Sequence, residues 1–149
     1  MAHIAALLSE AKTILLVDWP SRDVPDTLAR HGFTVISDDG PRTGYNSYEP
    51  AGDEVRVRPL AGPPETADVI YTHRPVDELP DIVETARALG ARAVWLQSGR
   101  DASGAKDPRG VWLSEEHARK AREIVERAGL SYFDAPYIAD AVRTGMTRR

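Results

Sequence analysis

The sequence has no cysteine, no long apolar run and no excess of positive charge. The absence of cysteine excludes disulfide bonds, thiolate nucleophiles and cysteine-ligated zinc, and it makes a reducing cytoplasm the expected location. No apolar run approaches the roughly 18 residues of a membrane-spanning helix, and residues 1–12 lack the basic region of a signal peptide. A net charge of -4 provides no field that attracts nucleic acid.

Phosphate-binding glycines are also missing at the one turn where the pattern predicts a nucleotide. The apolar run over residues 13–18 predicts a strand, and residues 23–31 predict a helix that ends at Gly32. Dinucleotide folds hold a pyrophosphate with such a strand, turn and helix. Here the turn reads Asp18-Trp19-Pro20-Ser21-Arg22, so side chains stand where glycines would let the backbone approach a phosphate.

Across its 149 residues the sequence alternates strand-like and helix-like segments. We expect strands at 13–18, 33–37, 68–72, 93–96 and 130–133, and helices at 3–11, 23–31, 76–89, 114–128 and 137–145. Residues 38–53 are expected to form a long loop, followed by a short edge strand at 55–58. The prediction is one α/β domain over residues 1–149, with an N-terminal helix within residues 1–12. Its architecture is a three-layer, doubly wound, Rossmann-like fold with a mainly parallel five-stranded sheet.

Four polar segments follow the predicted strands and mark the place where a ligand would bind. In doubly wound folds, ligands bind beyond the carboxyl ends of the strands, near the point where the strand order reverses. The candidate binding residues in these segments are Pro20, Ser21, Arg22, Asp38, Thr72, His73, Arg74, Gln97, Ser98 and Gly99. Polar loops end the strands of any α/β domain, so ordinary connections remain the alternative.

Charged residues in these segments suggest specific contacts. Asp38 stands at about the interval at which dinucleotide folds place an acidic residue on a ribose hydroxyl. The sequence Asp38-Asp39-Gly40 is also an ordinary turn, which is the favoured interpretation. Arg22, at the start of the predicted helix, could pair with a phosphate, and His73-Arg74 could meet an anion.

The histidines predict neither a metal site nor catalysis. The four histidines, His3, His31, His73 and His117, are far apart in the sequence, and none has a partner at a metal-ligand spacing. His117 follows Glu115 and Glu116 in a predicted helix, so we expect it on a solvated face. Because no nucleophile with a matching base can be named, the sequence does not predict an enzyme.

Three segments share their order and several residues with a known family. They are residues 91–99 (ARAVWLQSG), residues 121–133 with AGL at 128–130, and residues 20–25 (PSRDVP) with 30–36 (RHGFTVI). Together they resemble the CoA-binding domain family, stand-alone Rossmann-like proteins similar to the nucleotide domain of succinyl-CoA ligase alpha subunits. The resemblance extends over most of residues 12–140. It implies CoA as the ligand, with NAD or another adenine nucleotide as the alternative, and a phosphate held at the first strand–helix turn.

The sequence departs from that family where the phosphates of CoA would lie. The family's first turn reads V-G-A-S, whereas here Val17 is followed by Asp18-Trp19, and the family's V-N-P after strand two is replaced by Ser37-Asp38-Asp39. A carboxylate near a phosphate would repel it by about 1 kcal/mol or more per close pair. We therefore expect weakened or altered CoA binding. An acidic residue after the second strand better suits a ligand that presents a ribose.

Two functions follow from these features. The first is a CoA-binding or related nucleotide-binding protein without catalytic activity. The second is a degenerate Rossmann-like domain without bound CoA, which binds another protein through the 38–53 loop and its Tyr45 and Tyr48. The expected partner is a small nucleotide ligand, not nucleic acid or a membrane, and self-association into a homo-oligomer stays open.

Overall fold

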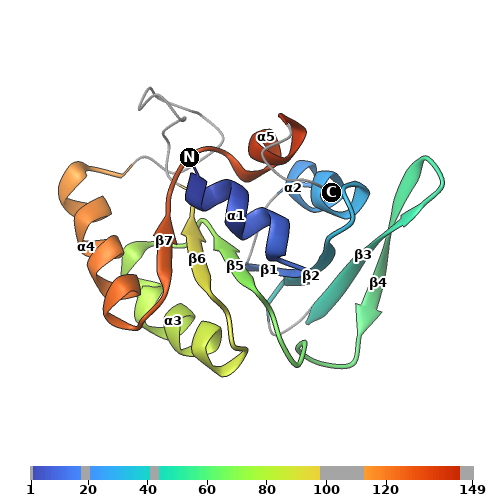
Figure 1. Ribbon diagram of the computed structural model, residues 1–149. Helices are drawn as coiled ribbons and strands as arrows, with labels where there is room; N and C mark the ends of the chain where they lie inside the picture. Colours follow the sequence, from blue (N-terminus) through green and yellow to red (C-terminus); the bar gives the residue numbers. More distant parts are fainter. Residues whose placement is uncertain (1, 18–20, 41–43, 98–112, 145–149) are drawn as a thin grey trace.

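The computed structural model describes residues 2–17, 21–40, 44–97 and 113–144 (Figure 1). Along the chain the elements are α1 (Ala2–Glu10), β1 (Thr13–Val17), α2 (Asp23–Arg30), β2 (Thr34–Asp38), β3 (Tyr45–Ala51), β4 (Glu54–Leu60), β5 (Val69–Thr72), the 3-10 helix η1 (Val76–Glu78), α3 (Leu79–Ala88), β6 (Ala93–Leu96), α4 (Glu115–Arg127), β7 (Ser131–Phe133) and α5 (Ile138–Arg143).

The strands form one seven-stranded sheet in the order β4-β3-β2-β1-β5-β6-β7. The five strands from β2 to β7 in this order are mutually parallel. The other two, β3 and β4, form an antiparallel hairpin that pairs with β2 at one edge. The predicted α/β class with a mostly parallel sheet is therefore confirmed, whereas the predicted number of five strands is wrong.

The hairpin replaces most of the loop that the sequence predicted over residues 38–53. Residues 45–51 read YNSYEPA, which lacks the regular apolar alternation of a strand with one buried face. Their strand conformation comes from backbone pairing on both sides, with Val35 of β2 opposite Tyr48 and Val57 of β4 beyond it. Gly52 closes the hairpin with a φ of 65°, a conformation that glycine adopts without strain.

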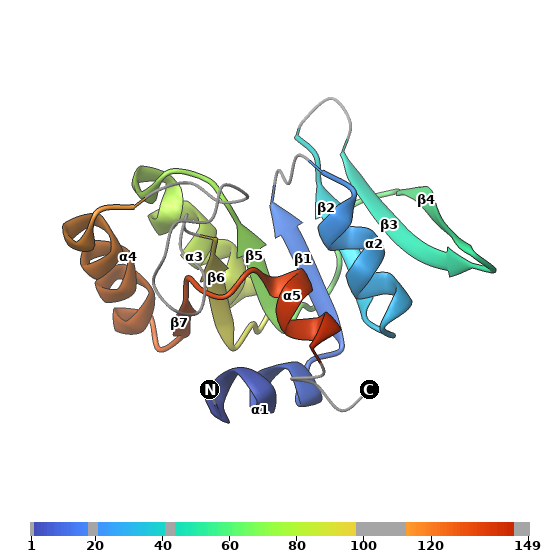
Figure 2. The same cartoon turned by 90° about the horizontal axis from the view of Figure 1, so that it is seen from above.

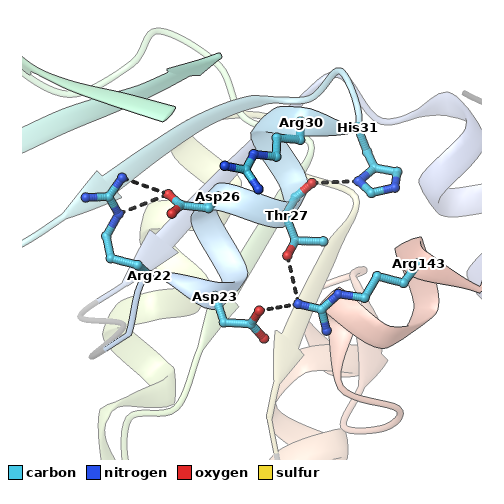
Figure 3. Close-up of a pocket in the computed structure, with 7 residues that line it drawn as sticks. All are labelled: Arg22, Asp23, Asp26, Thr27, Arg30, His31 and Arg143. Atoms are coloured by element: carbon cyan, nitrogen blue, oxygen red, sulfur yellow. Dashed lines mark hydrogen bonds and ion pairs between the residues drawn. The ribbon is translucent and has the colours of Figure 1, made fainter. Parts of the chain in front are cut away.

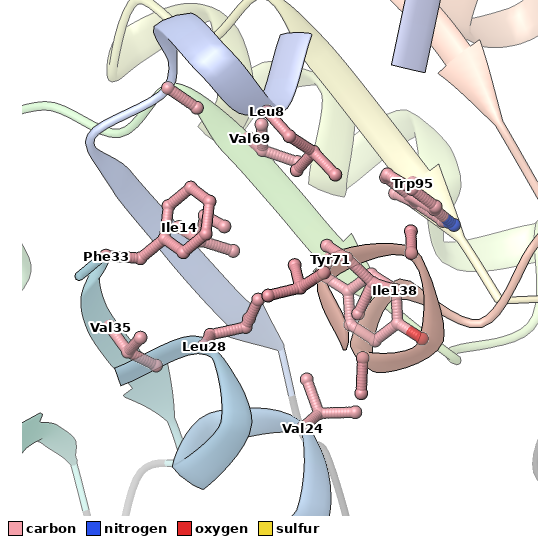
Figure 4. Close-up of a cluster of buried hydrophobic side chains, with 14 of the residues drawn as sticks. Leu8, Ile14, Val24, Leu28, Phe33, Val35, Val69, Tyr71, Trp95 and Ile138 are labelled. Carbon is pink, nitrogen blue, oxygen red and sulfur yellow. The ribbon is translucent and has the colours of Figure 1, made fainter. Parts of the chain in front are cut away.

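Helices cover both faces of the sheet, because side chains of a strand alternate between the two faces. Ile14, Tyr71 and Trp95 belong to an apolar cluster with residues of α1, α2 and α5 (Figure 4). Leu15 and Ile70 belong to a second cluster with residues of α3 and α4. Figure 2 shows the two groups of helices on opposite sides of the sheet.

The start of the central strand is held by one carboxylate. Asp68, just before β5, accepts hydrogen bonds on Oδ2 from the backbone N–H groups of Lys12 and Thr13, at 2.8 and 2.9 Å. Its own N–H donates to the carbonyl oxygen of Thr13 at 2.8 Å. Burial raises the pKa of Asp68, but the two backbone N–H groups and the charges of Arg92 and Lys12 outweigh it, so the pKa is lowered.

Replacing this carboxylate should make the protein less stable in a pH-dependent way. We expect Asp68→Asn to lower the free energy of unfolding by about 1–3 kcal/mol at neutral pH, because charged hydrogen bonds are lost. Since the folded-state pKa is lowered, the stabilisation is present above about pH 4 and is lost as the pH falls through the folded pKa. Urea unfolding at several pH values measures this difference. Asp81→Asn, at an exposed position of α3, is the control, and equal stability of the two variants would contradict the role of Asp68.

Candidate functional site

The order of the strands reverses beside β1, which lies between β2 and β5. At the end of β1, Val17 is opposite Asp38 of β2 on one side and Thr72 of β5 on the other. Thr72 is in turn opposite Leu96 of β6, and the N–H of Gln97 donates to the carbonyl oxygen of Thr72 at 2.9 Å. The structure therefore brings Asp38, Thr72 and Gln97 to one row of strand ends, at the kind of position where doubly wound folds bind ligands.

A cavity of about 610 Å³ lies at the Asp38 end of this row. The cavity is lined by residues around the start of β3 and the end of β4. They are Asp38, Gly40, Gly44, Tyr45, Leu60, Ala61, Gly62 and Pro63. Asp38 accepts the N–H of Gly40 on Oδ1 at 3.1 Å, so it makes the turn contact that the sequence predicted. Asp39 accepts hydrogen bonds from the Ser37 hydroxyl and the Asn46 amide, both at 2.7 Å. Its carboxylate therefore has hydrogen-bond partners within the fold.

In the segment after β5, the charged side chains of Arg74 and Glu78 form an ion pair with each other. Thr72 is fully buried and accepts the N–H of Arg74 on Oγ1 at 3.0 Å. The guanidinium of Arg74 donates to both carboxylate oxygens of Glu78, at 3.1 and 2.6 Å. This contact lowers the pKa of Glu78 despite the opposing effect of burial. The Arg74 charge is therefore already paired, while the preceding His73 lines a separate cavity.

Gln97 is fully buried at the end of β6. Its Oε1 accepts the Tyr71 hydroxyl at 2.7 Å, so the amide connects β6 to β5 within the core. Among the other predicted binding residues, Pro20, Ser98 and Gly99 lie outside the described residues. Ser21 is exposed just before α2.

Arg22 is held against the hairpin. Its Nε donates to Asp26 at 2.9 Å, and its Nη2 donates to the carbonyl oxygen of Val55 at 2.9 Å. The guanidinium carbon lies 5.3 Å from the centre of the Tyr48 ring. Figure 3 shows Arg22 and Asp26 together at the first turn of α2. Arg22 therefore connects α2 to β3 and β4, a long-range contact that its sequence neighbours do not indicate.

The first turn of α2 is also bonded to α5. Asp23 accepts the Tyr137 hydroxyl on Oδ2 at 2.9 Å, and its Oδ1 is bonded to Arg143. Arg143 also donates to the Thr27 hydroxyl at 3.0 Å, beside a cavity of about 340 Å³ between these helices (Figure 3). Both oxygens of Asp23 are thus engaged, and a positive charge accompanies its negative charge at the helix start.

His117 is exposed, as the predicted solvated face requires, and it also lines the same cavity as His73. This proximity is created by packing between α4 and η1, so no local spacing could have indicated it. Within residues 2–17, 21–40, 44–97 and 113–144, no group of three His, Cys, Asp or Glu residues could hold a metal ion. None of the helices described in the structure is long and apolar enough to cross a membrane.

Comparisons with known proteins agree with this arrangement. The family described as "CoA binding domain" matches residues 16–138. Among solved structures, one described as "The structure of cell-free ID.343 from Thermus thermophilus" is similar with a TM-score of 0.58. The identity is 24%, over 97% of this chain and 96% of that chain, which shows a shared fold. No curated protein matches the chain.

The closeness of Asp38 and Tyr45 at the cavity can be measured by titration. Burial, and then the negative charge of Asp38, raise the pKa of the Tyr45 phenol. Asp38→Asn removes the second cause, so the Tyr45 pKa should fall but stay above its ordinary value. Ultraviolet titration of the wild type, Asp38→Asn and Tyr45→Phe isolates the Tyr45 signal by difference. An unchanged Tyr45 pKa in Asp38→Asn would mean that the two side chains do not interact.

Proposed function

The chain belongs to the CoA-binding domain family, and we propose that it binds coenzyme A or a related adenine nucleotide without catalysing a reaction. The family match over residues 16–138 is the observation that carries this proposal. The row of strand ends at the switch point supports it, because ligands of doubly wound folds bind there. The two apolar clusters on the two faces fit a three-layer Rossmann-like arrangement. The non-catalytic part rests on the sequence, which has no cysteine and no evident pair of nucleophile and base.

The adenosine end is proposed to occupy the cavity beside Asp38. This cavity adjoins the end of β2, where dinucleotide folds bind the ribose. Asp38 uses Oδ1 for the Gly40 N–H, and a ribose hydroxyl can donate to the carboxylate as well. The same negative charge opposes a 3′-phosphate. The geometry therefore favours adenine nucleotides without that phosphate over CoA itself.

The phosphates are proposed to lie at the first strand–helix turn, near the start of α2. The N–H groups of Asp23 and Val24 at the helix start and the exposed Ser21 hydroxyl offer donors to an anion, while Pro25, the next residue of the helix, has no N–H. The Asp23 carboxylate would repel a phosphate there, but Arg143, which also donates to Asp140 at 3.3 Å, offsets part of its charge. Arg22 adds a positive charge at the same turn, although its guanidinium also binds Asp26 and the hairpin.

Binding to another protein is the second candidate, and the exposed edge of the hairpin favours it. Val57 on β4 is 39% exposed, although its side chain is large and apolar. The two tyrosines proposed for this role are half-buried instead. Tyr45 packs with the cluster of α3 and α4, and Tyr48 with the cluster of α1, α2 and α5, so they lie on opposite faces. A docking surface would therefore centre on β4.

Comparing CoA, dephospho-CoA and NAD tests the ligand and its orientation. We expect saturable thermal stabilisation by at least one of them, with dephospho-CoA binding more tightly than CoA. Asp38→Asn should improve CoA binding by about fivefold relative to dephospho-CoA, because one charge repulsion of ~1 kcal/mol is removed. Asp53→Asn, in the exposed hairpin turn, is the control. If none of the three stabilises the protein at millimolar concentration, the proposal is rejected in favour of protein binding. If Asp38→Asn and Asp53→Asn change CoA binding equally, the adenosine does not bind beside Asp38.

Two arginines at opposite ends of α2, Arg22 just before it and Arg30 at its last position, distinguish phosphate binding from attachment of the hairpin. Arg22 and Arg30 both donate to hairpin carbonyl oxygens, those of Val55 and Asp53, from opposite ends of the helix. We expect both Arg22→Ala and Arg30→Ala to lower the melting temperature without ligand. Only Arg22→Ala should also reduce the stabilisation by the nucleotide that binds best, since only Arg22 adjoins the proposed phosphate site. Unreduced stabilisation in Arg22→Ala would show that Arg22 only anchors the hairpin.

A further inference from the structure

Two histidines that are distant in the sequence line one cavity at the carboxyl end of β5. The cavity has a volume of about 340 Å³, and we call it the His73–His117 pocket. It is lined by His73, Pro75, Val76, Asp77, Leu113, His117 and Lys120. His73 follows β5, Asp77 belongs to η1, and His117 and Lys120 belong to α4, which contacts η1. The pocket is separate from the cavity beside Asp38.

The donors of the pocket come mainly from one face of α4. His117 and Lys120 are three residues apart, so they are neighbours on the helix surface. The Ser114 hydroxyl accepts the N–H of His117 at 3.1 Å, which fixes the helix start and places His117 in its first turn. Lys120 carries a positive charge, and each imidazole of His73 and His117 offers at least one N–H donor. These groups suit an anion.

The remaining lining residues limit the size and character of that anion. Val76 is half-buried and Leu113 is buried, so part of the wall is apolar. The volume is at the lower end of the roughly 300–1,000 Å³ of small-molecule sites. The pocket therefore suits a compact anionic group on a short aliphatic chain. Asp77 contributes an opposing carboxylate; because Asp77, His117 and Lys120 are all exposed, solvent screens its repulsion and their attraction alike.

We propose that the His73–His117 pocket binds the carboxylate of a short aliphatic acid. In a form that rests on the proposed function, this carboxylate is the free end of a dicarboxylic acid whose other carboxyl group forms the thioester with CoA. His73 directly follows Thr72 in the row of strand ends, so the pocket adjoins the place proposed for the nucleotide. A free acid is the other source of the same chemistry.

Histidine NMR tests the pocket directly, because His31 provides a reference outside it. His31 Nδ1 lies 2.8 Å from the carbonyl oxygen of Thr27 at the end of α2. We expect propionate at constant ionic strength to shift the His73 and His117 ring signals saturably and to leave His31 unchanged. Signals are assigned with His73→Gln and His117→Gln, and neutral propionamide should shift none of them. Absence of saturation, or equal shifts at His31, would overturn the proposal.

Charge variants then test which groups hold the carboxylate. Lys120→Gln should weaken propionate binding by roughly threefold or more, and Asp77→Asn should strengthen it, because one attraction and one repulsion are removed. Arg119→Gln, also on the exposed part of α4 but not lining the pocket, is the matched control. Equal effects of Lys120→Gln and Arg119→Gln on propionate binding would mean that only the general surface charge matters. The proposal that the pocket binds a carboxylate would then be wrong. Far-ultraviolet circular dichroism confirms that the variants are folded.

Comparing the binding of two CoA thioesters tests whether the carboxylate in the pocket belongs to an acyl group or to a free acid. Malonyl-CoA and propionyl-CoA have acyl chains of equal length that end in a carboxylate and a methyl group, respectively. Tighter binding of malonyl-CoA, with the advantage lost in Lys120→Gln, supports the acyl end as the occupant. Equal binding of the two thioesters would overturn that part, even if free propionate binds. If neither CoA nor any thioester binds the wild type, the proposed function fails, while the propionate titration still tests the pocket.

Discussion

Pairing of β1 on both sides is the constraint on which the rest of the structure depends. Its parallel pairing with β2 and β5 aligns Asp38, Val17 and Thr72, and its alternating side chains divide the core between the two faces. Asp68 holds the opposite end of the strand through two backbone N–H groups. The candidate site therefore depends on a register that is set within the buried core.

Local sequence patterns predicted the elements whose stability is mainly local or apolar. The buried run of β6 and the Ser114 start of α4 are examples, since the Ser114 hydroxyl does cap the helix. The sequence also predicted that Asp38, Thr72 and Gln97 would lie along one edge of the sheet, because parallel strands end at the same edge. It did not predict β3, whose polar residues are ordered by pairing with β2 and β4. Long-range packing, here of α4 against η1, likewise explains why the sequence did not predict that His117 and His73 line one pocket.

Acidic residues made the sequence look unfavourable for CoA, and the structure gives several of them internal partners. Asp39 is bonded to Ser37 and Asn46, and Asp23 to Tyr137 and Arg143. Arg143 thus partly offsets the charge of Asp23, while neutral donors occupy one oxygen of Asp39. Asp38 is different, because it lines a cavity and retains acceptor capacity beyond its bond to Gly40. Among the described residues, Asp38 is therefore the carboxylate on which the proposed discrimination between nucleotides depends, while Asp18 lies outside the described residues.

The bond between α2 and α5 also has a consequence for synthesis of the protein. Asp23 receives its two partners from positions 114 and 120 residues later in the chain. While the chain grows from the ribosome, β1, α2 and β2 emerge long before Tyr137 and Arg143. During that interval Asp23 lacks both of these partners, so the contact between α2 and α5 can form only after the last helix has emerged.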